Sequence, residues 1–148
     1  MKLCDLPMRK YQNDYLRVYS GGYTNSSSVI SDDQWYYAQG DGNENSGGNA
    51  GQWGLALSKM IKDQFDIPIA IFNGAHGGQP IEFFQRPEDY DSSTSTNYGR
   101  LYYRLNKSGL KSYVRAVLWS QGESNSFVNG LSTNQYKSYF ENLMTAWQ

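Results

Sequence analysis

A largely apolar run that ends abruptly in polar residues constrains this chain most. The run covers residues 114–119, and residues 120–125 follow it directly. A run of this length, rich in β-branched and large apolar residues, is typical of a strand buried on both faces. Open α/β sheets bind ligands where such strands end. We therefore predict a buried strand at 114–119 and a binding site that follows it, with candidate residues Gln121, Glu123, Ser124 and Asn125.

A second apolar run, residues 67–72, predicts another buried parallel strand. It leads directly into residues 73–80, which include glycines at 74, 77 and 78. Three glycines in so short a stretch indicate a backbone held close to another group, with N–H groups left available. We expect this loop and the one at 120–125 to lie side by side at one edge of the sheet.

Apolar spacings of three and four residues predict helices that begin near Trp53, Tyr98 and Ser132. The predicted apolar face of the first helix carries Trp53, Leu57, Met60, Ile61 and Phe65, and that of the last carries Tyr136, Phe140, Leu143, Met144 and Trp147. Ser132 and Gln135 form a capping-box pattern at the start of the last one. A short strand is expected at 15–19. The order helix, strand, helix, strand, helix over residues 53–148 predicts an α/β fold with a parallel sheet. The polar residues 23–52 are expected to form an irregular surface excursion within a single domain, pinned by the aromatic residues 35–38.

Composition excludes several classes of function. The formal net charge is −1 and no block of Lys or Arg occurs, so neither nucleic acid nor a membrane surface is an expected partner. A single cysteine, Cys4, excludes an internal disulfide framework and a cysteine-based metal cluster. Residues 41–52 lack the glycine and the bidentate glutamate of a calcium loop. No metal or cofactor is therefore predicted.

A side-chain amide and free backbone N–H groups that converge on one point describe an oxyanion hole. Gln121 and the glycine loop supply both kinds of donor. The alternative is that Gln121 and Asn73 only bind turn backbone, as amides often do. The thirteen tyrosines and four tryptophans suit sugar binding, but a tyrosine-rich core explains them equally well.

Two blocks resemble the sialate O-acetylesterase-like carbohydrate esterases. Residues 73–82, NGAHGGQPIE, are similar to that family's N-A-x-x-G-G-T-x-I-E block, and residues 118–125, LWSQGESN, to its L-W-Y-Q-G-E-S-N block. The resemblance spans about residues 50–147. It implies the fold of the SGNH (GDSL) hydrolase superfamily, a flavodoxin-like three-layer α/β sandwich with a parallel sheet.

The resemblance implies a serine esterase that acts on O-acetylated carbohydrates, extracellular or periplasmic in location. It makes Gln121 the side-chain donor to the oxyanion and assigns a backbone N–H donor to Gly77 or Gly78, of which we favour Gly78. Six other polar residues of the two blocks are candidates for contact with the substrate: Asn73, His76, Gln79, Glu123, Ser124 and Asn125. Glu123 would brace the loop or bind the sugar, and Ser124 and Asn125 would continue the turn.

The sequence departs from the family in its nucleophile and its base. The family's G-Q-S-N block and its D-x-x-H histidine have no counterpart here. Ser20 follows a predicted strand that resembles the one after the family's nucleophile, so Ser20 is not the expected nucleophile. His76 is expected to line the pocket and not to act as the base. Without a serine activated by a histidine, acyl transfer has no nucleophile.

We therefore expect the central fragment of an esterase domain, inactive alone and only marginally stable because apolar surface stays exposed. The alternative is a non-catalytic carbohydrate-binding or structural module on the same scaffold. A flavodoxin-like nucleotide binder is excluded, because Gln79-Pro80 follows the glycines and no phosphate-loop lysine occurs.

Overall fold

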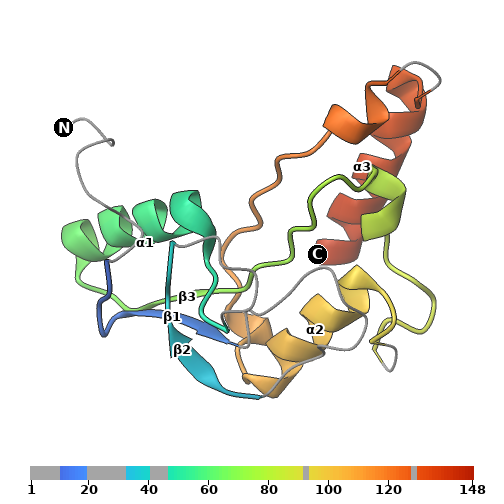
Figure 1. The fold of residues 1–148 in the computed structure, drawn as a ribbon. Helices are drawn as coiled ribbons and strands as arrows, with labels where there is room; N and C mark the ends of the chain where they lie inside the picture. The colour runs from blue at the N-terminus through green and yellow to red at the C-terminus, as the bar shows by residue number, and fades with distance from the viewer. Residues whose placement is uncertain (1–10, 20–32, 41–46, 92–93, 128–129) are drawn as a thin grey trace. The chain divides into compact units, whose positions relative to one another are not determined.

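A computed structural model describes residues 11–19, 33–40, 47–91, 94–127 and 130–148 (Figure 1). Ser20 and residues 41–46, the first half of the stretch compared with a calcium loop, lie outside these ranges. The chain divides into two compact units, Met1–Asn73 and Gly74–Gln148. Within the described ranges, no helix is long and apolar enough to cross a membrane.

The first unit is built on a three-stranded sheet. Its strands are β1 (Leu16–Tyr19), β2 (Trp35–Tyr37) and β3 (Ile69–Ile71), in the order β2-β1-β3. β1 runs parallel to β3 and antiparallel to β2. The predicted α/β class is confirmed, but the prediction of a parallel sheet is wrong because β2 makes the sheet mixed.

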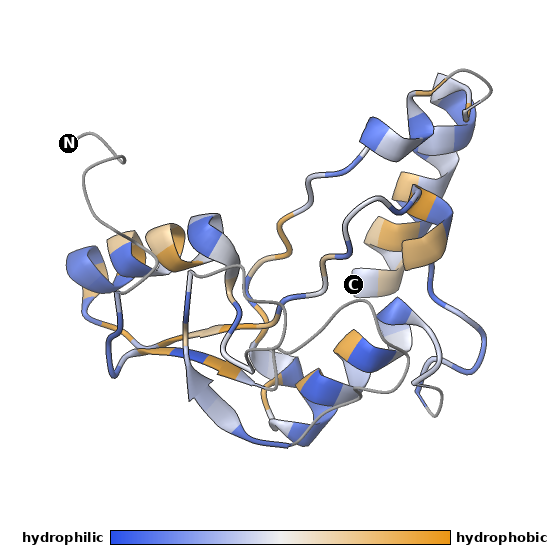
Figure 2. Ribbon diagram, in the orientation of Figure 1, coloured by the Kyte–Doolittle hydropathy of each residue, from blue (hydrophilic) through white to orange (hydrophobic). Residues whose placement is uncertain are grey.

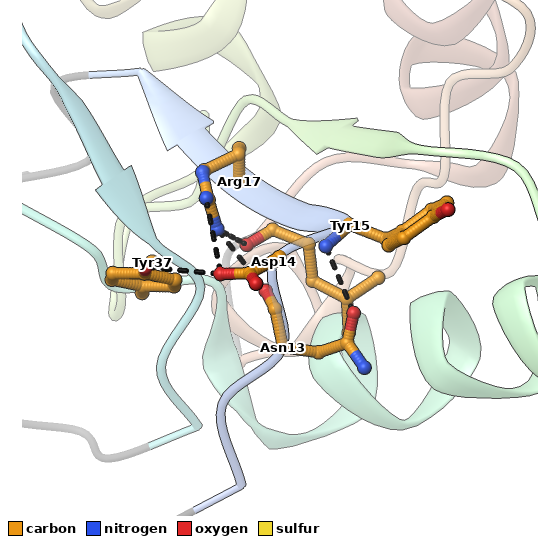
Figure 3. A network of polar contacts seen from close by, with 6 residues as sticks. Asn13, Asp14, Tyr15, Arg17 and Tyr37 are labelled. Atoms are coloured by element: carbon orange, nitrogen blue, oxygen red, sulfur yellow. Dashed lines mark hydrogen bonds and ion pairs between the residues drawn. The ribbon is translucent and has the colours of Figure 1, made fainter.

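β2 lies within the segment predicted to be irregular. Its three residues are all aromatic, a type that fits well on a pleated surface. Figure 3 shows how β1 and β2 are joined beyond their backbone pairing. The Arg17 guanidinium carbon lies 4.0 Å from the centroid of the Tyr37 ring, and the Tyr37 hydroxyl donates to Asp14 Oδ1 at 3.0 Å. The aromatic residues therefore form a strand rather than pinning a loop.

The helix α1 (Gly51–Phe65) packs against β1 and β3. The predicted helix is confirmed, but the predicted apolar face is not the one that is buried. Leu55 is fully buried, whereas Trp53 is 60% exposed. The buried residues of α1 are Gly54, Leu55 and Ser58, of which only Leu55 is large and apolar. Apolar periodicity does not detect a buried face that consists mostly of small residues.

The described residues of the second unit form two α-helices, α2 (Asn97–Lys107) and α3 (Thr133–Trp147). Both confirm the predicted helices, and the capping box at Ser132 is present. Three short 3₁₀ turns accompany them: η2 (Ile81–Phe84), η3 (Lys111–Tyr113) and η4 (Glu123–Asn125). The buried core comprises Phe84, Tyr98 and Leu143, with Trp119 and Trp147 packed against it.

The predicted strand at 114–119 is wrong. These residues form neither helix nor strand, and the side chains of Val117 and Leu118 are 47% and 55% exposed. Figure 2 shows this hydrophobic segment outside every helix and strand. The described residues of the second unit contain no strand, so none is present there to pair with the backbone of the run.

The predicted strand at 67–72 is shorter and less buried than expected. β3 covers only three residues, of which Ala70 is exposed, and Ile67 before it is also exposed. Ile69 and Ile71 pack against the core beneath α1, whereas Ala70 between them points to the other face and is exposed. The strand is therefore not buried on both faces. The core of this unit instead comprises Leu16, Val18, Ala38, Ala50 and Leu55.

Candidate functional site

Both polar segments singled out by the sequence line one cavity in the second unit. Its volume is about 520 Å³, within the usual range of small-molecule sites. The glycine loop contributes Ala75, His76, Gly77, Gly78 and Gln79, and the segment after the apolar run contributes Ser120, Gln121, Glu123, Ser124 and Phe127. The two segments therefore come together as predicted, although they do not follow two paired strands.

The side chain of Gln121 connects the two segments. Its Nε2 donates to the Gln79 carbonyl at 3.0 Å and to Asn125 Oδ1 at 2.9 Å. Its Oε1 accepts from the Tyr136 hydroxyl at 2.9 Å. Because Nε2 carries only two hydrogens, both are used within the protein in this state. Gln121 here binds turn backbone, which is the alternative that the sequence left open.

This network fixes the orientation of the Gln121 amide. If the amide were flipped, its oxygen would face the oxygens of Gln79 and Asn125, both of which are acceptors. Asn125 Oδ1 cannot turn away, because it also accepts from the Ile81 N–H at 2.8 Å. Asn125 Nδ2 donates to Glu82 Oε2 at 2.9 Å, which completes the network.

Asn125 and Asn73, both predicted to contact substrate, do not line the cavity. Asn125 is buried, and its amide is used in the network with Gln121, Ile81 and Glu82. Asn73 belongs to the first unit, where its Nδ2 donates to the Asn49 carbonyl at 3.3 Å. Asparagine in a turn often serves the backbone in this way.

Two glycines of the loop have backbone N–H groups without a hydrogen-bond partner in the described part of the chain. No hydrogen bond to a described residue is recorded for the N–H of Gly77 or Gly78. A Cβ atom on either glycine would meet nothing within 4 Å. Gly78 has a φ of 73°, in the left-handed region that favours glycine. The loop thus offers the unpaired donors that the sequence predicted.

His76 lines the cavity with its ring packed edge-on against Phe83, at a centroid distance of 4.9 Å. Its Nδ1 is buried and has no hydrogen-bond partner among the described residues. No hydrogen bond joins the imidazole to any serine in the described part of the chain. The structure therefore places His76 on the cavity wall without the partner that a general base requires.

Sequence reasoning missed five residues of the site, of which three line the cavity: Ala75, Ser120 and Phe127. Phe127 is 72% exposed and lies between the predicted site residues and the helix predicted to begin near Ser132. Glu82 and Tyr136 bind the side chains of Asn125 and Gln121 from other elements. Glu82 lies in the first quoted block and Tyr136 on the predicted helical face, but neither pattern indicates such a partner.

Comparison with protein families gives one match. Residues 29–148 match the family model described as carbohydrate esterase, sialic acid-specific acetylesterase. Searches of curated proteins and of solved structures found no match. The family match covers well over half of the chain and contains both blocks that line the cavity. The chain therefore belongs to the sialic acid-specific acetylesterase family of carbohydrate esterases.

Proposed function

We propose that this chain carries the oxyanion-binding part of a carbohydrate O-acetylesterase with the SGNH fold. The observation that carries the proposal is the convergence of the Gly78 loop and Gln121 on one cavity. One segment offers unpaired backbone N–H groups and the other a side-chain amide of fixed orientation. This combination of donors suits the charge that develops on an ester carbonyl oxygen.

The proposed chemistry is acyl transfer from an acetylated sugar. Attack on the acetyl carbonyl turns its oxygen into an oxyanion, which accepts hydrogen bonds more strongly than a neutral carbonyl does. The Gln121 N–H that now donates to the Gln79 carbonyl would then donate to the oxyanion, with Gly78 N–H as the second donor. The tetrahedral intermediate breaks its bond to the sugar oxygen, which takes the proton that the base removed from the nucleophile. Water then hydrolyses the acyl-enzyme, which releases acetate and restores the nucleophile.

The nucleophile and the general base are not assigned to described residues. The family resemblance implies a serine and a histidine, and no described serine is bonded to His76. Side chains on the cavity wall would instead bind the sugar. Glu123 and Ser124 offer polar groups for its hydroxyls, and Phe127 offers an exposed aromatic face for its ring.

The second candidate is a non-catalytic carbohydrate-binding module. One observation favours it: both Nε2 hydrogens of Gln121 are already bound to protein acceptors. A cavity of this size with an aromatic wall would still bind a sugar. An esterase hydrolyses the acetyl ester, whereas a binding module binds the sugar without hydrolysing the ester.

The test measures hydrolysis of p-nitrophenyl acetate and of an O-acetylated sugar, with acetate release as the readout for the sugar. It compares residues 1–148 with the protein that the whole gene encodes. We expect hydrolysis by the protein from the whole gene and none by residues 1–148. Activity in residues 1–148 would identify a nucleophile within this chain, with Ser20 examined first. A lack of hydrolysis by both, with the sugar still bound, would overturn the proposal in favour of the binding module.

A further inference from the structure

The hydroxyl of Tyr136, in the first turn of α3, holds the segment that carries Gln121. Its oxygen lies 2.9 Å from both the backbone carbonyl oxygen and the side-chain oxygen of Gln121, so its single hydrogen is shared between these two acceptors. It also accepts from Trp119 Nε1 at 3.4 Å. One hydroxyl thus contacts the residues on both sides of Ser120, which itself lines the cavity.

The position of the Tyr136 hydroxyl is set by packing around it. The Trp119 ring lies 5.3 Å from Phe84 and 5.7 Å from Trp147, in centroid distances, within the core of the second unit. A capping box at Ser132 fixes the start of α3 one turn before Tyr136. Because a firmly held helix supplies the hydroxyl, its contacts with Gln121 form part of the folded structure and not of a surface loop.

The three hydrogen-bond partners of the Gln121 amide differ in how firmly they are held. Tyr136 and Asn125 are held by α3 and by the buried network, respectively. The third, the Gln79 carbonyl, belongs to the loop that lines the cavity. The Gln79 carbonyl is therefore the partner that a substrate oxygen can replace, while the other two bonds keep the plane of the Gln121 amide in place.

We propose that Tyr136 is a positioning residue that aims and polarises the Gln121 amide for oxyanion binding. The inference rests on the proposed esterase function. A hydroxyl that donates to Oε1 draws electron density toward the oxygen, which makes the N–H groups of the same amide better donors. Tyr136 touches no reacting atom, so its effect appears only through Gln121.

The test is Tyr136→Phe in the protein that the whole gene encodes. Phenylalanine keeps the ring and removes only the hydroxyl. We expect kcat for p-nitrophenyl acetate to fall about 5- to 10-fold, the equivalent of one neutral hydrogen bond, with KM unchanged. Tyr139→Phe is the matched control, since α3 also carries Tyr139 and no hydrogen bond from its hydroxyl to a described residue is recorded.

Hydrogen exchange of the Gln121 side-chain amide gives a second readout that does not depend on activity. Selective ¹⁵N-glutamine labelling makes the signals visible, and their loss in Gln121→Ala assigns them. We expect faster exchange in Tyr136→Phe and the original rate in Tyr139→Phe. Unchanged exchange in Tyr136→Phe would overturn the inference whatever the kinetics show.

A double variant separates this inference from the proposed function. If Tyr136 acts through Gln121, the fall in kcat from Tyr136→Phe disappears when Gln121 is already alanine. A normal kcat in Gln121→Ala would overturn the proposed function and this inference together. A low kcat in Gln121→Ala with a normal kcat in Tyr136→Phe would overturn this inference alone.

Discussion

Gly77 and Gly78 are adjacent on the cavity wall but differ in backbone conformation. A Cβ atom would find open space at both positions, whereas only Gly78 has a positive φ, of 73°. Space therefore does not distinguish the two glycines, and backbone conformation does. This difference supports Gly78 as the position whose N–H direction depends on glycine.

The matched pair Gly78→Ala and Gly77→Ala tests this point. We expect Gly78→Ala to destabilise the protein by about 1 kcal/mol, the cost of a left-handed conformation for alanine, and to lower kcat. Gly77→Ala should leave stability and kcat nearly unchanged. Urea unfolding and p-nitrophenyl acetate kinetics measure both effects, and equal losses in the two variants would contradict the assignment.

Most cavity residues could be predicted from the sequence because they lie in two short blocks. The other cavity residues lie within a few positions of Gly78 or Gln121 in the sequence. Predicting one residue of a segment therefore also predicts its neighbours. Asn125 was assigned to the substrate because the sequence does not show that its amide is used by Ile81 and Glu82. Tyr136 was missed because its contact with Gln121 exists only after α3 has packed.

At the scale of elements, helices were predicted better than strands. A helix makes its own backbone hydrogen bonds, so spacing and capping residues are enough to indicate α1, α2 and α3. A strand needs a neighbour that the local sequence does not contain. Residues 114–119 have the composition of a strand, but no strand in the described part of their own unit pairs with them.

The cap of α3 gives a prediction at this scale. Ser132 accepts from the Gln135 N–H, and Ser132→Ala removes that acceptor from the start of the helix. We expect a loss of about 1 kcal/mol in the free energy of unfolding, measured by urea denaturation. Ser138→Ala, at an exposed position inside the same helix, is the control and should be neutral or slightly stabilising. Equal losses would show that the cap does not hold α3.

At the scale of the whole molecule, each unit has its own core and leaves large apolar side chains exposed. Trp53, Met60 and Phe65 are exposed in the first unit, and Tyr113, Val117 and Leu118 in the second. Exposed apolar area contributes nothing to the burial that stabilises a fold. The sequence predicted exposed apolar surface, but not which side of α1 would carry it.

From the family membership and the cavity together, we propose that the Gln121 side-chain amide binds the oxyanion. This amide is held by Tyr136 and Asn125. It also donates to the carbonyl of Gln79, in the loop that lines the cavity. If this amide binds an oxyanion, removing it affects the transition state more than the bound substrate.

The most direct measurement is kcat for p-nitrophenyl acetate in the protein that the whole gene encodes, with and without Gln121→Ala. We predict a fall on the order of 100-fold or more, as expected for the loss of one oxyanion donor, with little change in KM. A Gln121→Ala variant that stays folded and retains the kcat of the unchanged protein would contradict the account.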